Sequence, residues 1–130
     1  MIPHFNGREF DGEVAIVTGA GLNTGSLIAR TLAAAGAAVL VNYKRAGEAA
    51  AATIAAIEAA AGRAITAQGD VCDREDVRRF VGLAADQLGV PTILVNNANV
   101  RSFRPLMETT PDEWRQTLAP TPARRATISA

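Results

Sequence analysis

Residues 14–25 read Val14-Ala15-Ile16-Val17-Thr18-Gly19-Ala20-Gly21-Leu22-Asn23-Thr24-Gly25, an apolar run that leads into a glycine-rich turn. The run at 14–18 is rich in β-branched residues and has no polar face, which is typical of a strand covered by helices on both sides. Apolar residues at helical spacing over 27–35 predict a helix after the turn, and Gly36 supplies a left-handed residue to end it.

The same order of apolar run and helical stretch recurs along the chain. Runs at 38–42, 64–68 and 92–96 predict further strands, the last of them fully buried, and residues 48–61, 73–88 and 110–118 predict further helices. Gly62 is the expected stop of the second helix, Asp73 the N-cap of the third, and Thr110 or Pro111 the start of the fourth. Alternating strands and helices predict a doubly wound parallel α/β sheet of the Rossmann type, with about four strands in the order 3-2-1-4.

Composition narrows the classes of protein and of partner. The chain has 130 residues, enough for one domain, and its 13 basic residues balance 13 acidic ones, which disfavours a nucleic-acid partner. No apolar run approaches the roughly 18 residues of a membrane helix, and the first residues do not resemble a secretion signal. A lone Cys72 fits a reducing compartment. We therefore expect a cytoplasmic protein without a membrane or nucleic-acid partner.

The turn at 19–25 is the first candidate site. Backbone N–H groups and a helix N-terminus between a strand and a helix can hold a diphosphate. The alternative is a β-to-α turn that is merely built from small residues. A P-loop is excluded, because Gly25 is followed by Ser26 with no lysine to reach the phosphates.

Three motifs then resemble one family. Thr18-Gly19-x-x-x-Asn23-x-Gly25 follows the first strand, Asp70-Val71 the third, and Asn96-Asn97-Ala98-Asn99 the fourth. Together they resemble the N-terminal half of short-chain dehydrogenases/reductases, nearest the 3-oxoacyl-[acyl-carrier-protein] reductase branch, over residues 12–118. The carboxyl edge of an open α/β sheet is where ligands bind. The resemblance implies oxidoreduction of a carbonyl or alcohol substrate with NAD(P).

The resemblance also implies a role for each matching residue. Positions near the diphosphate and its ribose are Gly19, Gly21, Leu22 and Thr24, while Gly25 lets the helix approach the strand. Asp70 and Val71 would hold the adenine, and Asn97, Ala98 and Asn99 would lie near the nicotinamide-side ribose, with Thr18 bracing that turn. The alternatives are a solvated turn carboxylate for Asp70 and a simple Asx turn for Asn97.

The end of the second strand carries Tyr43-Lys44-Arg45. An NAD-specific relative places a carboxylate there, whereas two cations can pair with a 2′-phosphate. We therefore expect NADP(H) in preference to NAD(H). A solvated basic corner is the alternative, and Leu22 stands where many NADP-using relatives carry another cation.

The chain departs from the family at several points. Asn23 and Asn99 replace glycines; asparagine tolerates left-handed φ, but each side chain takes space beside the cofactor, which lowers the expected affinity. The family's proton relay is a Tyr-x-x-x-Lys pair with a serine, and the only tyrosine and lysine here are the adjacent Tyr43 and Lys44. Thr121 stands where the family has a catalytic asparagine. We assign no catalytic residue and no metal ligand.

These departures leave three hypotheses open: a piece of an enzyme, a standalone NADP(H)-binding or sensing module, and a degenerate truncation product without a role.

We expect residues 1–11 to be an extension, residues 12–118 a dinucleotide-binding half-domain, and residues 119–130 a frayed tail from a frameshift or early stop. The strand at 92–96 would then present a free edge that favours self-association. Structural or surface roles are expected for His4, Cys72, Met107 and Trp114.

Overall fold

The computed structural model describes residues 6–120. Its elements are β1 (Val14–Val17), α1 (Asn23–Ala34), β2 (Ala38–Tyr43), α2 (Gly47–Ala59), β3 (Arg63–Gln68), α3 (Arg74–Gln87), β4 (Ile93–Val95), the 3-10 helix η1 (Leu106–Glu108) and α4 (Pro111–Leu118). The four strands form one parallel sheet in the order β3-β2-β1-β4, which confirms the predicted α/β fold and strand order. Among residues 6–120, no helix combines the length and the apolar character needed to cross a membrane.

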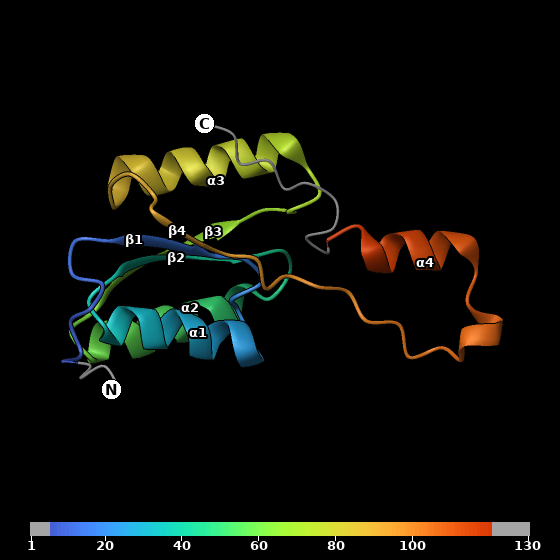
Figure 1. Ribbon diagram of the computed structural model, residues 1–130, viewed down its shortest axis with the longest axis horizontal. Helices are drawn as coiled ribbons and strands as arrows, with labels where there is room; N and C mark the ends of the chain where they lie inside the picture. Colours follow the sequence, from blue (N-terminus) through green and yellow to red (C-terminus); the bar gives the residue numbers. More distant parts are fainter. Residues whose placement is uncertain (1–5, 121–130) are drawn as a thin grey trace, which may run out of the picture.

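The sheet is covered on both faces, with α1 and α2 on one side and α3 on the other (Figure 1). Alternate residues of β1 enter two different cores. Ala15 and Val17 pack with residues of α1 and α2, whereas Val14 and Ile16 pack with Phe80 and its neighbours on α3. This two-sided burial explains why the first strand has no polar face.

Two helices on the same face end in left-handed residues, but only one of these is a glycine. Gly36 follows α1 with φ 102°, as predicted. After α2 the left-handed residue is Ala61 (φ 61°), and Gly62, the predicted stop, takes part in the helix end through its amide. Gly62 also allows close packing, because a Cβ there would lie 2.7 Å from Ile57 Cγ2. The amides of Ala61 and Gly62 donate to the carbonyls of Glu58 and Ile57, which closes the helix as a Schellman motif.

The fourth strand differs from the expected one. We predicted a fully buried strand over 92–96, but β4 is shorter, none of its residues is fully buried, and Leu94 is 38% exposed. The reason is its place at the edge of the sheet: β4 pairs with β1, and no other strand of residues 6–120 pairs with its outer side. This prediction of complete burial was wrong.

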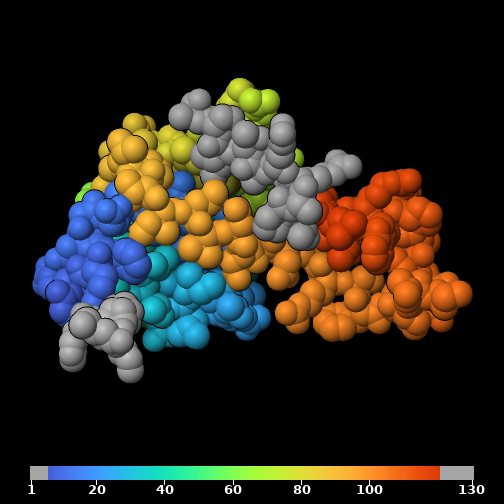
Figure 2. Space-filling view, in the orientation of Figure 1, coloured from blue at the N-terminus to red at the C-terminus, as the bar shows by residue number. Residues whose placement is uncertain are grey.

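Residues 99–120 form an arm that leaves the sheet and carries η1 and α4 away from the other helices (Figure 1). Its apolar side chains face solvent: Phe103 is 92% exposed and Met107 is 95% exposed. The space-filling view shows the arm standing beside the body of the molecule (Figure 2). Trp114, on α4, is 53% exposed.

The predicted N-terminal extension contacts the body. Phe10 packs against the core beside α1, and its amide donates to the carbonyl of Ala35 at 2.9 Å. His4, Thr121 and all but two residues of the predicted tail lie outside the described residues. The boundaries at residues 12 and 118 remain predictions.

Candidate functional site

The loop between β1 and α1 presents an open helix N-terminus at the carboxyl edge of the sheet. No side chain caps α1, and no acidic residue lies in its first turn. Among residues 6–120, the amides of Gly21 and Leu22 find no protein acceptor. By contrast, α3 is closed by its own carboxylate, since Asp73 accepts from the amides of Glu75 and Asp76. The positive end of α1 is therefore available to an external anion.

Close backbone packing explains the glycines of this loop. A Cβ on Gly19 would lie 2.7 Å from Ala98 Cα, and one on Gly25 would lie 2.5 Å from both Asn97 Nδ2 and the carbonyl oxygen of Gly19. Asn23 has φ 49°, so it adopts the left-handed conformation expected of a residue that replaces glycine. Leu22, Asn23 and Thr24 are exposed.

The segment after β4 holds this loop in place. Thr18 Oγ1 donates to the carbonyl of Val95 (3.3 Å) and accepts from the amides of Asn97 and Ala98 (3.1 Å each). Asn97 Nδ2 donates to the carbonyls of Thr18 (3.1 Å) and Gly19 (3.0 Å). The expected bracing by Thr18 is present. Because the Asn97 amide is occupied by the β1 loop, its role toward a ribose stays a prediction.

Two predicted site residues pair with each other. Lys44 Nζ lies 2.6 Å from Asp70 Oδ2, and Asp70 Oδ1 accepts from the amide of Cys72 at 2.9 Å. The Lys44 ammonium, followed by the Cys72 amide, lowers the pKa of Asp70, while partial burial opposes this shift. Burial raises the pKa of the Cys72 thiol, and the Asp70 carboxylate adds to this effect. The sequence showed a cation and a carboxylate but not that they meet.

The neighbours of Lys44 differ in their contacts. Tyr43 lies against two glycines: a Cβ on Gly21 would be 3.5 Å from Tyr43 Cβ, and one on Gly47 would be 3.4 Å from Tyr43 Cε2. Arg45 is exposed and forms no ion pair within residues 6–120. Arg45 is therefore the cation of this corner that is free of a carboxylate partner in the described part of the chain.

Sequence reasoning missed Asn42, the last polar residue before this corner. Asn42 is 1% exposed, and its side chain accepts from the amide of Gly19 (3.3 Å) and donates to the carbonyls of Ala67 (3.3 Å) and Gly69 (3.1 Å). The sequence feature that could have revealed Asn42 is a lone amide side chain near the end of an otherwise apolar strand.

Thr53 was missed as well. It is 3% exposed on α2, and its hydroxyl contacts Ser26 Oγ (2.8 Å) and the carbonyls of Ala49 (3.0 Å) and Gly21 (3.5 Å). The hydroxyl group therefore ties α2 to the loop and to the first turn of α1. The sequence feature that could have revealed Thr53 is that it is the single threonine in an alanine-rich helix.

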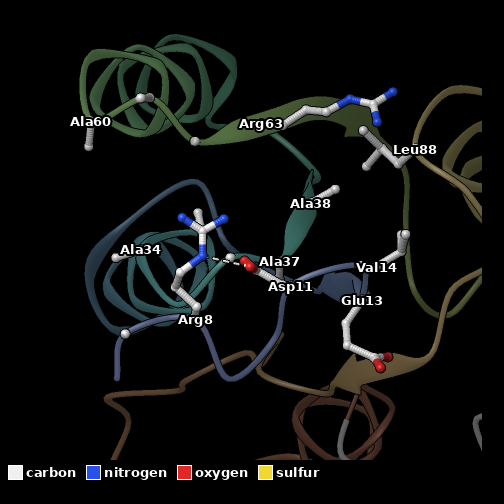
Figure 3. A pocket seen from close by; sticks show the side chains of 16 residues that line it. Arg8, Asp11, Glu13, Val14, Ala34, Ala37, Ala38, Ala60, Arg63 and Leu88 are labelled. Carbon is white, nitrogen blue, oxygen red and sulfur yellow. Dashed lines mark hydrogen bonds and ion pairs between the residues drawn. The ribbon is translucent and has the colours of Figure 1, made fainter. Parts of the chain in front are cut away.

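A hollow of about 460 Å³ lies at the opposite edge of the sheet, where the strands begin (Figure 3). Its charged side chains already have partners: Arg8 pairs with Asp11 at 2.6 Å, and the Arg63 guanidinium donates to the carbonyl of Gln87. None of the predicted cofactor residues lines this hollow.

The predicted residues therefore gather at one edge. Gly19 lies close to Ala98, Gly25 to Asn97 and Gly21 to Tyr43, and Lys44 pairs with Asp70. Val71 is half-buried after β3, and Asn99 is exposed where the arm begins. A parallel sheet in the order β3-β2-β1-β4, with helices on both faces and an open glycine-rich loop after β1, places the chain among Rossmann-like α/β proteins.

The chain belongs to the short chain dehydrogenase family, whose sequence profile matches residues 13–120. It is 42% identical over 108 residues to an uncharacterized oxidoreductase of Methylorubrum extorquens, covering 83% of this chain and 44% of that protein. It is 35% identical over 103 residues to a 3-oxoacyl-[acyl-carrier-protein] reductase of Synechocystis, covering 79% of this chain and 42% of that one.

A solved structure has the same fold. The short chain dehydrogenase of Burkholderia cenocepacia in complex with NADP is 40% identical, with a TM-score of 0.78, covering 85% of this chain and 45% of that chain. The chain thus spans less than half the length of these relatives, and what it shares with them is their N-terminal, cofactor-binding half.

Proposed function

We propose that residues 12–118 form a dinucleotide-binding half-domain that binds NADP(H) in preference to NAD(H). The observation that carries the proposal is the open start of α1, where two loop amides lack protein acceptors within residues 6–120 and neither a side-chain cap nor an acidic residue of the first turn occupies the positive end of the helix. A diphosphate matches this site in charge and in hydrogen-bonding capacity. When bound, the nicotinamide supplies hydride-transfer chemistry.

For the surrounding residues we propose the roles that the resemblance to the family implies, which their places at the edge support. The amides of Gly21 and Leu22 would donate to the diphosphate, with the Thr24 hydroxyl beside them. Asp70 and Val71, after β3, would face the adenine end. Asn97, Ala98 and Asn99, after β4, would lie toward the nicotinamide end. The narrow spacings at Gly19 and Gly25 support a loop whose shape is already set before the ligand arrives.

The preference for NADP(H) rests on charge at the end of β2. Lys44 and Arg45 follow this strand, and no carboxylate stands beside them in sequence. A 2′-phosphate could therefore pair with cations, whereas a 2′-hydroxyl would lack the acidic hydrogen-bond acceptor that NAD-specific sites provide. Lys44 is shared with Asp70, whereas Arg45 is not engaged within residues 6–120. Arg45 is therefore the residue expected to contribute more to the preference. The relative from Burkholderia cenocepacia is itself an NADP complex.

We expect this chain to bind the cofactor without turning over a ketone or alcohol. The sequence contains no Tyr-x-x-x-Lys pair, because Tyr43 and Lys44 are adjacent and both lie at the cofactor end. Without the cation that this spacing supplies, a phenol with its ordinary pKa of about 10 is a poor base near neutral pH. The alternative function is a standalone binding or sensing module, which the same binding site supports equally.

The test is a fluorescence titration of the chain with NADPH and with NADH, paired with an assay for ketone-dependent NADPH oxidation. We expect saturable binding, tighter for NADPH, and no turnover. Arg45→Ala should weaken NADPH binding by about tenfold and leave NADH binding unchanged, as loss of one charge-assisted contact predicts. Arg63→Ala, at the opposite edge, is the matched control.

Three outcomes would each contradict a part of the proposal. Failure of the folded chain to bind either dinucleotide would remove the cofactor site and leave the degenerate product as the remaining hypothesis. Equal affinity for NADPH and NADH, with no effect of Arg45→Ala, would remove the preference alone. Measurable ketone reduction would show that a proton donor other than the Tyr-x-x-x-Lys pair operates.

A further inference from the structure

Asn42 joins the carboxyl ends of three strands. Its side chain accepts from Gly19, which follows β1, and donates to Ala67 in β3 and to Gly69 just beyond it. Its main-chain carbonyl accepts from the amide of Ala20 at 2.8 Å. We propose that Asn42 is a positioning residue for cofactor binding, which acts through the β1–α1 loop without touching the cofactor. This inference rests on the proposed dinucleotide site.

The chemistry of the amide side chain explains why asparagine stands here. Asn42 is buried, so each of its polar atoms needs a partner. A carboxamide supplies one acceptor and two donor hydrogens, which match one amide and two carbonyl oxygens. Leucine offers neither function, and aspartate would set a carboxylate against the oxygens of Ala67 and Gly69.

The geometry links these bonds to the open amides of the loop. Asn42 accepts hydrogen bonds from the first two amides of the loop. Its side chain accepts from Gly19, and its main-chain carbonyl accepts from Ala20. The next two, of Gly21 and Leu22, have no protein acceptor in residues 6–120, and neither do the amides of the first three residues of α1. Gly19 adopts φ 60°, a conformation with alternatives of similar energy for glycine. The bond to Asn42 therefore selects the one loop conformation that leaves the anion-binding amides open.

Hydrogen exchange on the unaltered chain gives a first test that needs no substitution. The Gly19 amide should exchange slowly without cofactor, while those of Gly21 and Leu22 should exchange fast and become protected on addition of NADPH. A Gly19 amide that exchanges as fast as its two neighbours would overturn the inference, because the bond to Asn42 would then not hold the loop.

The second test compares Asn42→Leu with Ile57→Ala, a buried core change on α2. Ile57 is 2% exposed and packs beside Gly62, which lines the hollow at the opposite edge of the sheet. Both variants should lower the melting temperature. Only Asn42→Leu should raise the NADPH dissociation constant, by about tenfold or more for the loss of a buried hydrogen bond, and reduce the upward shift in melting temperature that NADPH produces. If Asn42→Leu does not fold, Asn42→Ser replaces it with the same criteria.

The outcomes separate the two proposals. NADPH affinity that falls equally in the Asn42 and Ile57 variants, or in neither, would overturn the positioning role while leaving the cofactor site intact. No NADPH binding by the unaltered chain would overturn the proposed function and this inference together. Faster exchange at Gly19 in the Asn42 variant, with unchanged exchange at Gly19 in Ile57→Ala, is the signature of the positioning role.

Discussion

The body of the molecule, residues 13–98, and the arm, residues 99–120, are stabilised in different ways. In the body, residues far apart in sequence meet, as when Thr18 binds the segment after β4. In the arm the bonds are short-range: Thr110 and Glu113 form a capping box, and Arg115 pairs with Asp112 at 2.6 Å. A local signal is thus enough to form α4, but burial of its apolar side chains requires a surface that residues 6–120 do not supply.

The largest contrast is expected from one substitution made in each region. Phe80→Ala empties a fully buried position against β1 and should lower the free energy of unfolding by about 3–5 kcal/mol. Phe103→Ala, at a position 92% exposed, should change it by less than about 0.5 kcal/mol. Urea denaturation of both variants measures the difference. Equal destabilisation would show that the arm packs on the body.

A second contrast concerns glycines. Gly25→Ala should destabilise the body by about 1–3 kcal/mol and weaken NADPH binding, since its Cβ would lie 2.5 Å from the Gly19 carbonyl oxygen and force the loop to move. Gly82→Ala on α3 meets nothing within 4 Å and should stabilise by about 0.5–1 kcal/mol through helix propensity. Thermal unfolding with and without NADPH separates these effects. An unchanged affinity in Gly25→Ala would show that the loop adapts without cost to the site.

We further propose that the free edge of β4 and the apolar arm support self-association. β4 exposes Leu94 and lacks a second strand partner within residues 6–120. Leu94→Lys should therefore weaken dimer formation by about tenfold or more, because a charged side chain disfavours edge-to-edge pairing. Sedimentation at tens of micromolar, compared with the unaltered chain, measures this. An unaltered chain that stays monomeric would contradict the proposal.

Sequence reasoning succeeded where the signal lies within a few residues and where topology follows from element order. Asp73 was predicted as an N-cap and Thr110 or Pro111 as a helix start; the side chains of Asp73 and Thr110 both cap their helices. It failed where the answer depends on strand register. Tyr43 pairs with Gln68, so Lys44 comes beside the segment that carries Asp70, and no local pattern predicts that register. The edge position of β4 was predicted correctly from element order, but the exposure of its side chains was not, because an apolar run alone does not show whether other elements cover both of its faces.

A smaller effect is expected at the end of α2. Ala61→Gly should raise the free energy of unfolding by about 0.5–1 kcal/mol, because alanine is strained at φ 61° and glycine is not. The same change at Ala60, the preceding C-cap residue with φ −92°, should lower it. Denaturant midpoints of the two variants are the measurement. A stability gain at both positions would show that relief of strain is not the cause.

The smallest expected effect is the pH dependence of the Lys44–Asp70 pair. The folded chain lowers the pKa of Asp70, chiefly through Lys44, so the carboxylate form favours folding. This contribution is present above the ordinary aspartate pKa and is lost as pH falls through the lowered value, below about pH 4. Lys44→Gln should raise the Asp70 pKa toward its ordinary value, whereas Arg45→Gln should leave it in place. Carboxyl-carbon NMR titration of Asp70 checks this, and equal pKa values in the two variants would show that the amide of Cys72, rather than the ammonium, holds the carboxylate.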